Sequence, residues 1–149
     1  MQLMRANAQA GRKARSRSFR LPERLLTLLD ERARELGESA NRLAEQLIDE
    51  GLHTRTHPLI YFREGAAGDR RPALIGTRLY VWQVIDTLRD SDGSIAAAAD
   101  YLGLNPAQVQ ACISFYADFR DEVDAYAAQE RELARREQER WRREQEVLG

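Results

Sequence analysis

The chain has 149 residues, of which 43% are hydrophobic and 32% are charged, and this composition suits one or two small globular domains. It contains no apolar run long enough to span a bilayer and no apolar block at the N-terminus of the kind found in signal peptides, so we expect a cytoplasmic protein without a membrane partner. Its single cysteine, Cys112, excludes an intramolecular disulfide, and we expect this residue to pack in a core.

The net charge of -1 hides a strongly basic N-terminus. The first twenty residues carry no acidic side chain, and their basic residues are Arg5, Arg12, Lys13, Arg15, Arg17 and Arg20. We predict that residues 1–15 form a basic arm, in which Lys13 and Arg15 contact the phosphates of DNA and release its counterions. A solvated, disordered tail is the alternative for the part before Arg15.

Residues 16–21 alternate in character as a β-strand does. Ser16, Ser18 and Arg20 fall on one face, and Phe19 and Leu21 fall on the other. A lone strand cannot pair its own backbone groups, so we expect it to pair antiparallel with the same strand of a second copy. The polar face of such a two-stranded ribbon fits the major groove of DNA, where Arg suits guanine and Ser suits several base edges.

Two amphipathic helices follow this strand. The first begins near Pro22 and ends at Gly37, and the second is capped by Ser39 and is expected to end at Gly51. Their apolar residues recur at helical spacing and are Leu25, Leu26, Leu28, Leu29, Ala33, Leu36, Ala40, Leu43, Ala44, Leu47 and Ile48. We therefore predict that residues 16–52 form a dimer with a four-helix core.

This stretch resembles the ribbon-helix-helix family of bacterial repressors and antitoxins, through its alternating strand, leucine-rich first helix, Gly-Ser turn and Ala/Leu second helix. The resemblance implies that the outward strand residues read bases and that the start of the second helix, Ser39, Ala40 and Asn41, holds a phosphate. Arg17 stands where the family commonly has an apolar residue, so we expect it at the start of the strand, touching phosphate. The alternative is a helical hairpin with a basic lead-in.

Residues 53–58 are expected to be a linker. His53 and His57 have a spacing that suits metal binding on a helix, but Gly51 and Pro58 argue against a helix here, and no third ligand follows. We predict no metal site and no cofactor.

Residues 59–120 are predicted to form a β-hairpin followed by helices. Residues 59–62 and 72–75 are β-prone, residues 81–88 have a wide apolar face, and Ser94 and Asn105 are expected to cap two further helices around a turn at Gly103. These last two helices fit a helix-turn-helix template. The second of them has no Lys or Arg between residues 106 and 118, which favours a structural or partner-docking role over DNA reading by Gln108, Gln110 and Ser114.

Residues 59 to about 126 also resemble the domain-of-unknown-function-433 family. The motifs that carry this resemblance are Gly76-Thr77-Arg78-Leu79, Val81-Trp82, Leu104-Asn105-Pro106-Ala107-Gln108-Val109, Tyr116-Ala117-Asp118 and Glu122-Val123-Asp124. Tyr80 departs from the proline that many relatives have there. Members often look like antitoxins that partner PIN-like ribonucleases, and the combination with a ribbon-helix-helix front end looks like a VapB-type antitoxin.

Residues 121–149 are rich in Glu, Arg, Gln and Ala and are predicted to form a charged helix, supported by the pairs Glu132 with Arg136, Glu139 with Arg143, and Glu137 with Arg140. Its first turns, with Val123, Tyr126 and Ala127, are expected to touch the preceding domain. A tryptophan on a hydrated helix suggests a covering partner. The residues predicted to dock a toxin are Leu133, Arg136, Arg140, Trp141, Arg142, Arg143 and Leu148.

If that toxin is a PIN-like nuclease, the resemblance implies acidic metal ligands with which an arginine such as Arg140, Arg142 or Arg143 pairs. A solvated helix and a self-associating coiled coil are the alternatives for this tail. The chain shows no nucleophile beside a base, no metal-ligand cluster and no phosphate-cradling loop, so we do not expect an enzyme.

The sequence thus predicts a mainly α protein: a ribbon-helix-helix dimer, a hairpin plus helix-turn-helix-like domain, and a long C-terminal helix. We expect an antitoxin that represses its own operon by binding operator DNA and neutralises a PIN-like ribonuclease, as a homodimer that forms higher oligomers with the toxin. The alternative is a ribbon-helix-helix transcriptional regulator without a toxin.

Overall fold

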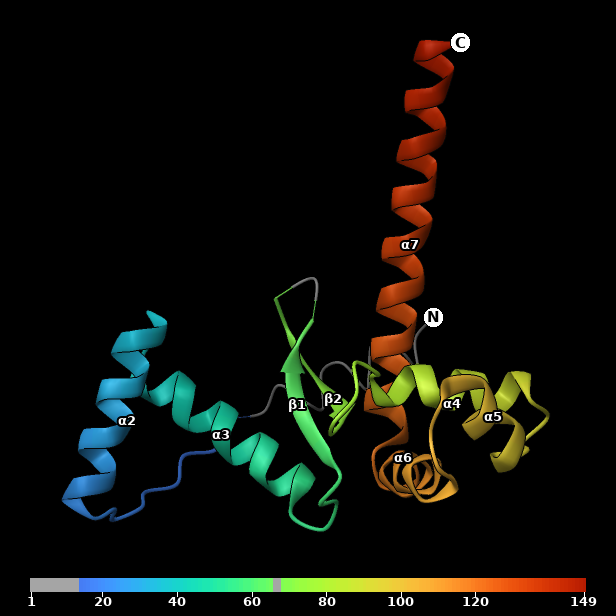
Figure 1. Cartoon of the computed structure of the whole chain (residues 1–149). Helices are drawn as coiled ribbons and strands as arrows, with labels where there is room; N and C mark the ends of the chain where they lie inside the picture. The colour runs from blue at the N-terminus through green and yellow to red at the C-terminus, as the bar shows by residue number, and fades with distance from the viewer. Residues whose placement is uncertain (1–13, 66–67) are drawn as a thin grey trace. The chain divides into compact units, whose positions relative to one another are not determined.

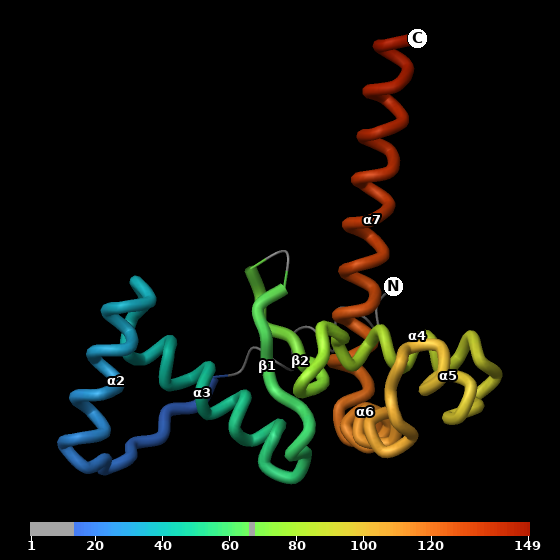
Figure 2. Tube along the Cα trace, in the orientation of Figure 1, coloured from blue at the N-terminus to red at the C-terminus, as the bar shows by residue number. Residues whose placement is uncertain are grey.

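The computed structural model describes residues 14–65 and 68–149, and it is mainly α-helical with one small antiparallel hairpin (Figures 1 and 2). The chain divides into two compact units, of which the first ends at Gln46 and the second begins at Leu47. We describe each unit by itself. Of the predicted basic arm, Lys13 and everything before it lie outside the described residues.

The first unit contains helix α2 (Glu23–Leu36) and the first half of helix α3 (Ala40–Thr54). Pro22 directly precedes α2, and Gly37 ends it with a φ of 67°, a left-handed conformation that glycine adopts without a steric penalty. The Ser39 hydroxyl accepts a 3.1 Å hydrogen bond from the Arg42 amide, as predicted for a cap of the second helix. Residues 14–22 form neither helix nor strand in the single chain, so the predicted ribbon is not present within one copy.

Helix α3 continues past Gly51, where we expected it to end, and reaches Thr54. A glycine inside a helix costs only about 1 kcal/mol relative to alanine. That cost is offset here because the last turn of α3, which belongs to the second unit, packs on α7 and Phe119 of the same unit through His53. The segment expected as a linker therefore begins helical, and the His57 side chain that follows is buried rather than solvated.

After the second half of α3, the second unit continues with the predicted hairpin of β1 (Ile60–Glu64) and β2 (Arg70–Leu74). The strands are antiparallel, with Ile60 opposite Leu74 and Glu64 opposite Arg70. Strand β2 also bridges to Tyr80, which joins the hairpin to the helix that follows. Prolines are tolerated at sheet edges, and Pro72 is accommodated in this two-stranded sheet.

Three helices then form the body of the unit: α4 (Val81–Asp90), α5 (Ile95–Leu102) and α6 (Pro106–Asp118). The predicted caps are confirmed. The Ser94 hydroxyl accepts from the Ala97 amide, and Asn105 and Gln108 form a reciprocal capping box. The core includes Ile60, Phe62, Leu74, Val81, Val84, Ile85, Ala99, Val109, Cys112, Phe115 and Val123.

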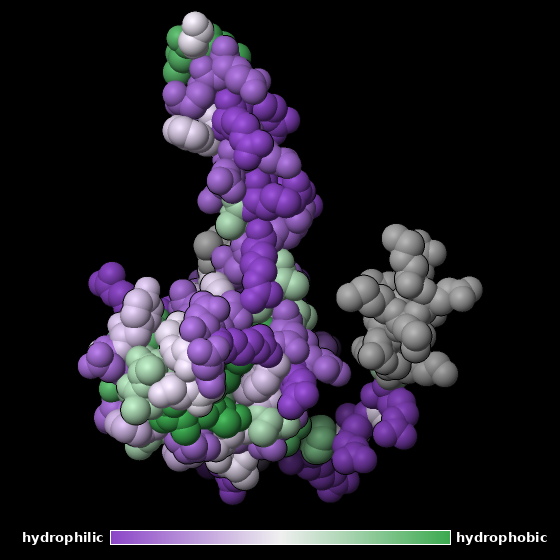
Figure 3. All heavy atoms as spheres, turned by 90° about the vertical axis from the view of Figure 1, so that its right-hand side faces the viewer, coloured by the Kyte–Doolittle hydropathy of each residue, from purple (hydrophilic) through white to green (hydrophobic). Residues whose placement is uncertain are grey.

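Helix α7 (Arg120–Leu148) leaves this core and projects into solvent (Figures 1 and 3). Its first turns are anchored by buried Val123 and Ala127, as expected, whereas every residue from position 134 onward is exposed. None of the helices in residues 14–65 and 68–149 has both the length and the apolar character that crossing a membrane requires.

The ion pairs along α7 differ in part from the expected ones. Arg136 contacts Glu132 at 3.0 Å, as predicted. Glu139 pairs with Arg135 rather than Arg143, and Arg140 pairs with Glu144 rather than Glu137. The reason is that each arginine on a helix has several carboxylates within three or four positions, and the sequence alone does not rank them.

Candidate interaction surfaces

The residues predicted to read DNA lie in the exposed segment before α2. Ser18 and Arg20 are exposed, and Arg15, Ser16 and Arg17 lie beside one another around a shallow hollow. The single chain thus leaves these side chains free in solvent, but it does not order them on one face of a strand.

The predicted phosphate site is the start of α3. The Ser39 hydroxyl accepts a hydrogen bond from the Arg42 amide, and the Ser39 carbonyl accepts one from the Leu43 amide. The amides of Ala40 and Asn41 therefore lack an intrahelical acceptor, as the first amides of a helix always do. Asn41 is exposed and Ala40 is half-buried. The geometry is that of an ordinary capped helix start, which is compatible with anion binding.

The first unit leaves a broad apolar face uncovered. Only Ala33 and Leu43 are buried among its described hydrophobic side chains, because two short helices cannot enclose a core. The exposed large hydrophobic residues of this face, with their exposed fractions, are Phe19 (65%), Leu21 (41%), Leu25 (39%), Leu26 (45%), Leu28 (44%) and Leu36 (62%). A group of exposed large apolar side chains of this kind indicates an interaction site.

The chain's two histidines, which we expected in a linker, both contact acidic side chains of other elements. His53 Nε2 lies 2.7 Å from Glu122 of α7, and His57 Nε2 lies 2.7 Å from Asp118 at the end of α6. The two imidazoles also contact Phe119, at ring-centroid distances of 4.3 and 6.0 Å. We call these two pairs the histidine clamp, and it joins the last turn of α3 and the loop after it to the α6–α7 junction.

Both ring nitrogens of His53 face oxygen acceptors. Nδ1 lies 2.7 Å from the Asp49 carbonyl oxygen, while Nε2 contacts the Glu122 carboxylate. Only the protonated imidazolium donates from both nitrogens. Burial of the ring opposes protonation, but the Asp49 backbone carbonyl and the carboxylates of Glu122 and Asp49 outweigh it, so the pKa of His53 is raised above 6.5.

No group of three or more potential metal-ligating side chains exists in the part of the chain that the structure describes. One sequence signal matches the clamp: His53 and His57 are four residues apart, as are the aromatic pair Phe115 and Phe119 and the acidic pair Asp118 and Glu122. Because residues 53–58 were expected to form a linker, this shared spacing did not lead to a predicted contact.

The sequence analysis also missed Arg71, which is 1% exposed and is the largest fully buried side chain. Its guanidinium pairs with Asp69 at 3.1 Å and with Glu130 of α7, and it lies 5.6 Å from the ring of Tyr126. A buried arginine needs such partners because an unpaired buried charge is very costly. Arg71 thereby ties the hairpin to α7 at the point where α7 leaves the core.

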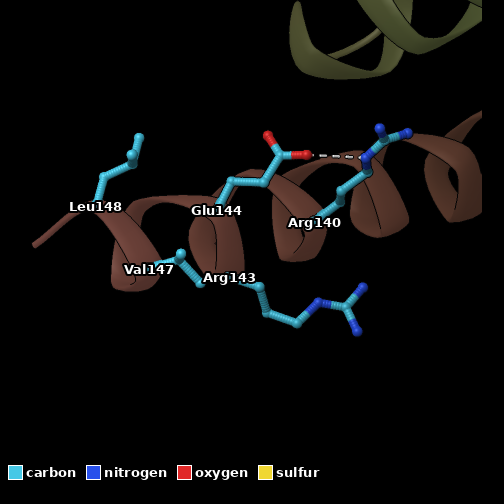
Figure 4. A pocket seen from close by; sticks show the side chains of 5 residues that line it. All are labelled: Arg140, Arg143, Glu144, Val147 and Leu148. Carbon is cyan, nitrogen blue, oxygen red and sulfur yellow. Dashed lines mark hydrogen bonds and ion pairs between the residues drawn. The ribbon is translucent and has the colours of Figure 1, made fainter.

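The residues predicted to dock a toxin fall into two groups along α7. Leu133 and Arg136 lie near the core, in a groove of about 620 Å³ that Asp69 and Arg71 also line. Arg140, Arg143 and Leu148 lie together near the C-terminal end, with Glu144 and Val147 (Figure 4).

Hydrophobic side chains are exposed toward the tip of α7. Trp141 is 61% exposed, Val147 86% and Leu148 81%, and Figure 3 shows hydrophobic atoms at the end of an otherwise hydrophilic helix. Arg142 and Arg143 form no ion pair within the described residues, whereas Arg140 is held by Glu144 at 3.0 Å. Val147 was absent from the predicted docking residues, although it adjoins Leu148.

Cys112 packs in the core, as expected. Its side chain is fully buried, and burial raises the pKa of the thiol to about 12. A thiol with this pKa stays protonated at neutral pH and is a poor nucleophile.

Comparison with known proteins agrees with one of the two predicted resemblances. Residues 69–116 match the model of a family described as "Protein of unknown function (DUF433)". No curated protein and no solved structure matches the chain. The match covers about a third of the chain, from just before β2 to near the end of α6, and so supports the predicted resemblance for β2 and for helices α4 to α6.

Proposed function

We propose that this protein is an antitoxin and autorepressor, with a DNA-binding dimer at its N-terminal end and a ribonuclease-docking helix at its C-terminal end. The observation that carries the proposal is the uncovered apolar face of the first unit, which follows directly on an exposed basic segment. A ribbon-helix-helix dimer accounts for both features at once.

The DNA-binding half rests on burial and charge. Pairing residues 16–21 of two copies covers Phe19 and Leu21, which are exposed in one copy, and brings the leucines of both α2 helices into one core. Covering a side chain of this size contributes about 1.5–3 kcal/mol when the burial is complete. The opposite face of the ribbon then presents Ser16, Ser18 and Arg20 twice, related by a two-fold axis, as a palindromic operator requires.

The docking half rests on α7. The helix is long, every residue of it from position 134 onward is exposed, and it carries an exposed tryptophan. Large aromatic side chains dominate the energetics of protein interfaces, and an exposed one is costly unless a partner covers it. The toxin proposed as that partner is a PIN-like ribonuclease encoded beside this protein.

The two ends are coupled in this proposal. A ribonuclease oligomer that binds α7 of two dimers crosslinks them, and the linked dimers bind paired operator half-sites with higher avidity.

A gel-shift titration tests the coupled function. The probe is the DNA upstream of the gene, with purified protein and increasing amounts of the neighbouring ribonuclease. We expect operator affinity to rise at low ribonuclease ratios, and Arg20→Ala to weaken binding by about 1–3 kcal/mol while the dimer persists. Unchanged affinity at every ratio contradicts the coupling, and an Arg20→Ala protein that no longer dimerises places Arg20 in the core.

The second candidate is a transcriptional regulator without a toxin, favoured by the ion pairs that α7 forms within itself. Arg135 bridges Glu132 and Glu139, and these contacts support a solvated helix that needs no partner. Co-expression with the neighbouring reading frame separates the two functions. A stable complex that is lost on truncation before Leu133 supports the antitoxin, and its absence supports the regulator.

A further inference from the structure

The exposed part of α7 repeats every seven residues. The three successive segments are QERELAR (129–135), REQERWR (136–142) and REQEVLG (143–149). Each has a glutamate at its second position and at least one apolar residue at its fifth or sixth. Because seven residues make nearly two helical turns, equivalent positions of the three segments lie almost above one another.

The repeat places glutamates within the apolar stripe rather than beside it. Leu133, Glu137, Trp141, Glu144 and Leu148 are spaced by four, four, three and four residues, which is the pattern of a single helix face. We call this face the seam. All of its members except half-buried Leu133 are exposed, and Figure 4 shows Glu144 and Leu148 projecting from the same side of α7.

The seam does not suit a second copy of itself. In a parallel pair of α7 helices, Glu137 faces Glu137 and Glu144 faces Glu144. In an antiparallel pair that sets the apolar positions against each other, Glu137 faces Glu144. Arg140 projects from the same side of α7 and supplies one cation for the two seam glutamates of each copy. Either arrangement therefore still brings an excess of negative charge together in a partly desolvated contact, which is destabilising. The occupant is therefore a different protein.

We propose that the seam docks in an apolar groove of the partner that carries two cationic side chains, one facing Glu137 and one facing Glu144. Seven residues of helix rise about 10 Å, so the two cations are about that far apart. In the free chain Glu144 is bound by Arg140 at 3.0 Å, and the partner's cation replaces that contact. This inference rests on the proposed docking function and names the chemistry of its partner.

The chain offers a matched control on the opposite face of α7. Glu139 and Glu146 each lie two residues, about 200°, from their counterparts in the seam and are also seven residues apart. Each pair contains one glutamate bound to an arginine, Glu144 to Arg140 and Glu139 to Arg135, and one without an ion pair within the described residues.

The experiment compares E137Q/E144Q with E139Q/E146Q in the full-length protein, with the ribonuclease encoded beside it as the probe. Calorimetry at two salt concentrations measures the affinity of each variant and of the wild type for the ribonuclease. Circular dichroism verifies that all three proteins have equal helix content. We expect E137Q/E144Q to bind at least about tenfold more weakly and to lose most of the salt dependence, because it leaves the partner's cations unpaired. The control is expected to stay within about twofold of the wild type.

Three results overturn the inference. If the wild type binds the ribonuclease and the two variants bind it with equal affinity, the seam glutamates do not lie in the interface. The proposed docking function is then unaffected. Failure of the wild type to bind the ribonuclease overturns the docking function and the inference together. If light scattering shows that E137Q/E144Q forms larger oligomers than the wild type, a second copy of this chain covers the apolar stripe.

Discussion

His53 shows how a side chain acquires its chemistry from residues far away in the sequence. Its neighbours in the chain supply the Asp49 carbonyl and carboxylate, and the contact with Glu122 comes from a helix 69 positions later. Burial of the ring opposes protonation, but the Asp49 carbonyl and the two carboxylates outweigh it and raise the pKa of His53. A residue that the sequence assigned to a linker therefore joins two elements.

This arrangement predicts that stability falls as the pH rises. Because the pKa of folded His53 is raised above the ordinary 6.5, its ion pairs contribute fully below about pH 6.5, and the contribution is lost as the pH rises through the folded pKa. Thermal unfolding between pH 5.5 and 8.5 measures the effect. His53→Gln should flatten this part of the profile, and a decline that survives in His53→Gln assigns the effect to another group.

Loss of the buried Arg71 guanidinium is expected to lower the free energy of unfolding. Arg71→Met keeps the apolar stem but leaves Asp69 and Glu130 without their cation. Both carboxylates are partly solvated, so we expect a loss of about 2 kcal/mol in the free energy of unfolding, less than for a fully buried pair. Urea denaturation measures it. Arg135→Met is the control, because Arg135 also contacts two glutamates but is exposed; equal losses for both variants would show that burial of Arg71 is unimportant.

At the scale of elements, local signals predicted the helices well. Gly37, Ser94, Gly103 and the capping box at Asn105 each end or start a helix as expected, because a cap depends on residues within one turn of itself. Gly51 is the exception. A glycine is only a weak break in a helix, and packing at its far end carried α3 on to Thr54.

Helix α7 carries the prediction for docking. Trp141→Ala should weaken ribonuclease binding by about 2 kcal/mol or more, since a buried tryptophan is a typical anchor of an interface, and should leave operator binding unchanged. Titration calorimetry measures the first and gel shift the second.

Tyr101→Ala is the control for Trp141→Ala, because Tyr101 is an 80% exposed aromatic residue on α5 rather than α7. Undiminished affinity of Trp141→Ala, or an equal loss in both variants, would make α7 a solvated helix rather than an anchor.

At the scale of the whole molecule, the exposed leucines of the first unit predict a dimer. Phe19→Ser should convert it to a monomer, because Phe19 is 65% exposed in one copy and lies on the inward face of the proposed ribbon. Light scattering over a concentration series measures the change. Ser18→Ala, on the outward face, should remain dimeric, and a monomeric wild type would refute the ribbon.

By itself the sequence determined the mainly α class, the β-hairpin and the capped helices. These features follow from periodicity and from residues that act on their immediate neighbours. Only the tertiary structure decided the histidine clamp, the buried position of Arg71 and the choice of ion pairs along α7. Each of these joins groups that are distant in the chain or equivalent in spacing, and such contacts are selected by packing, which no local pattern records.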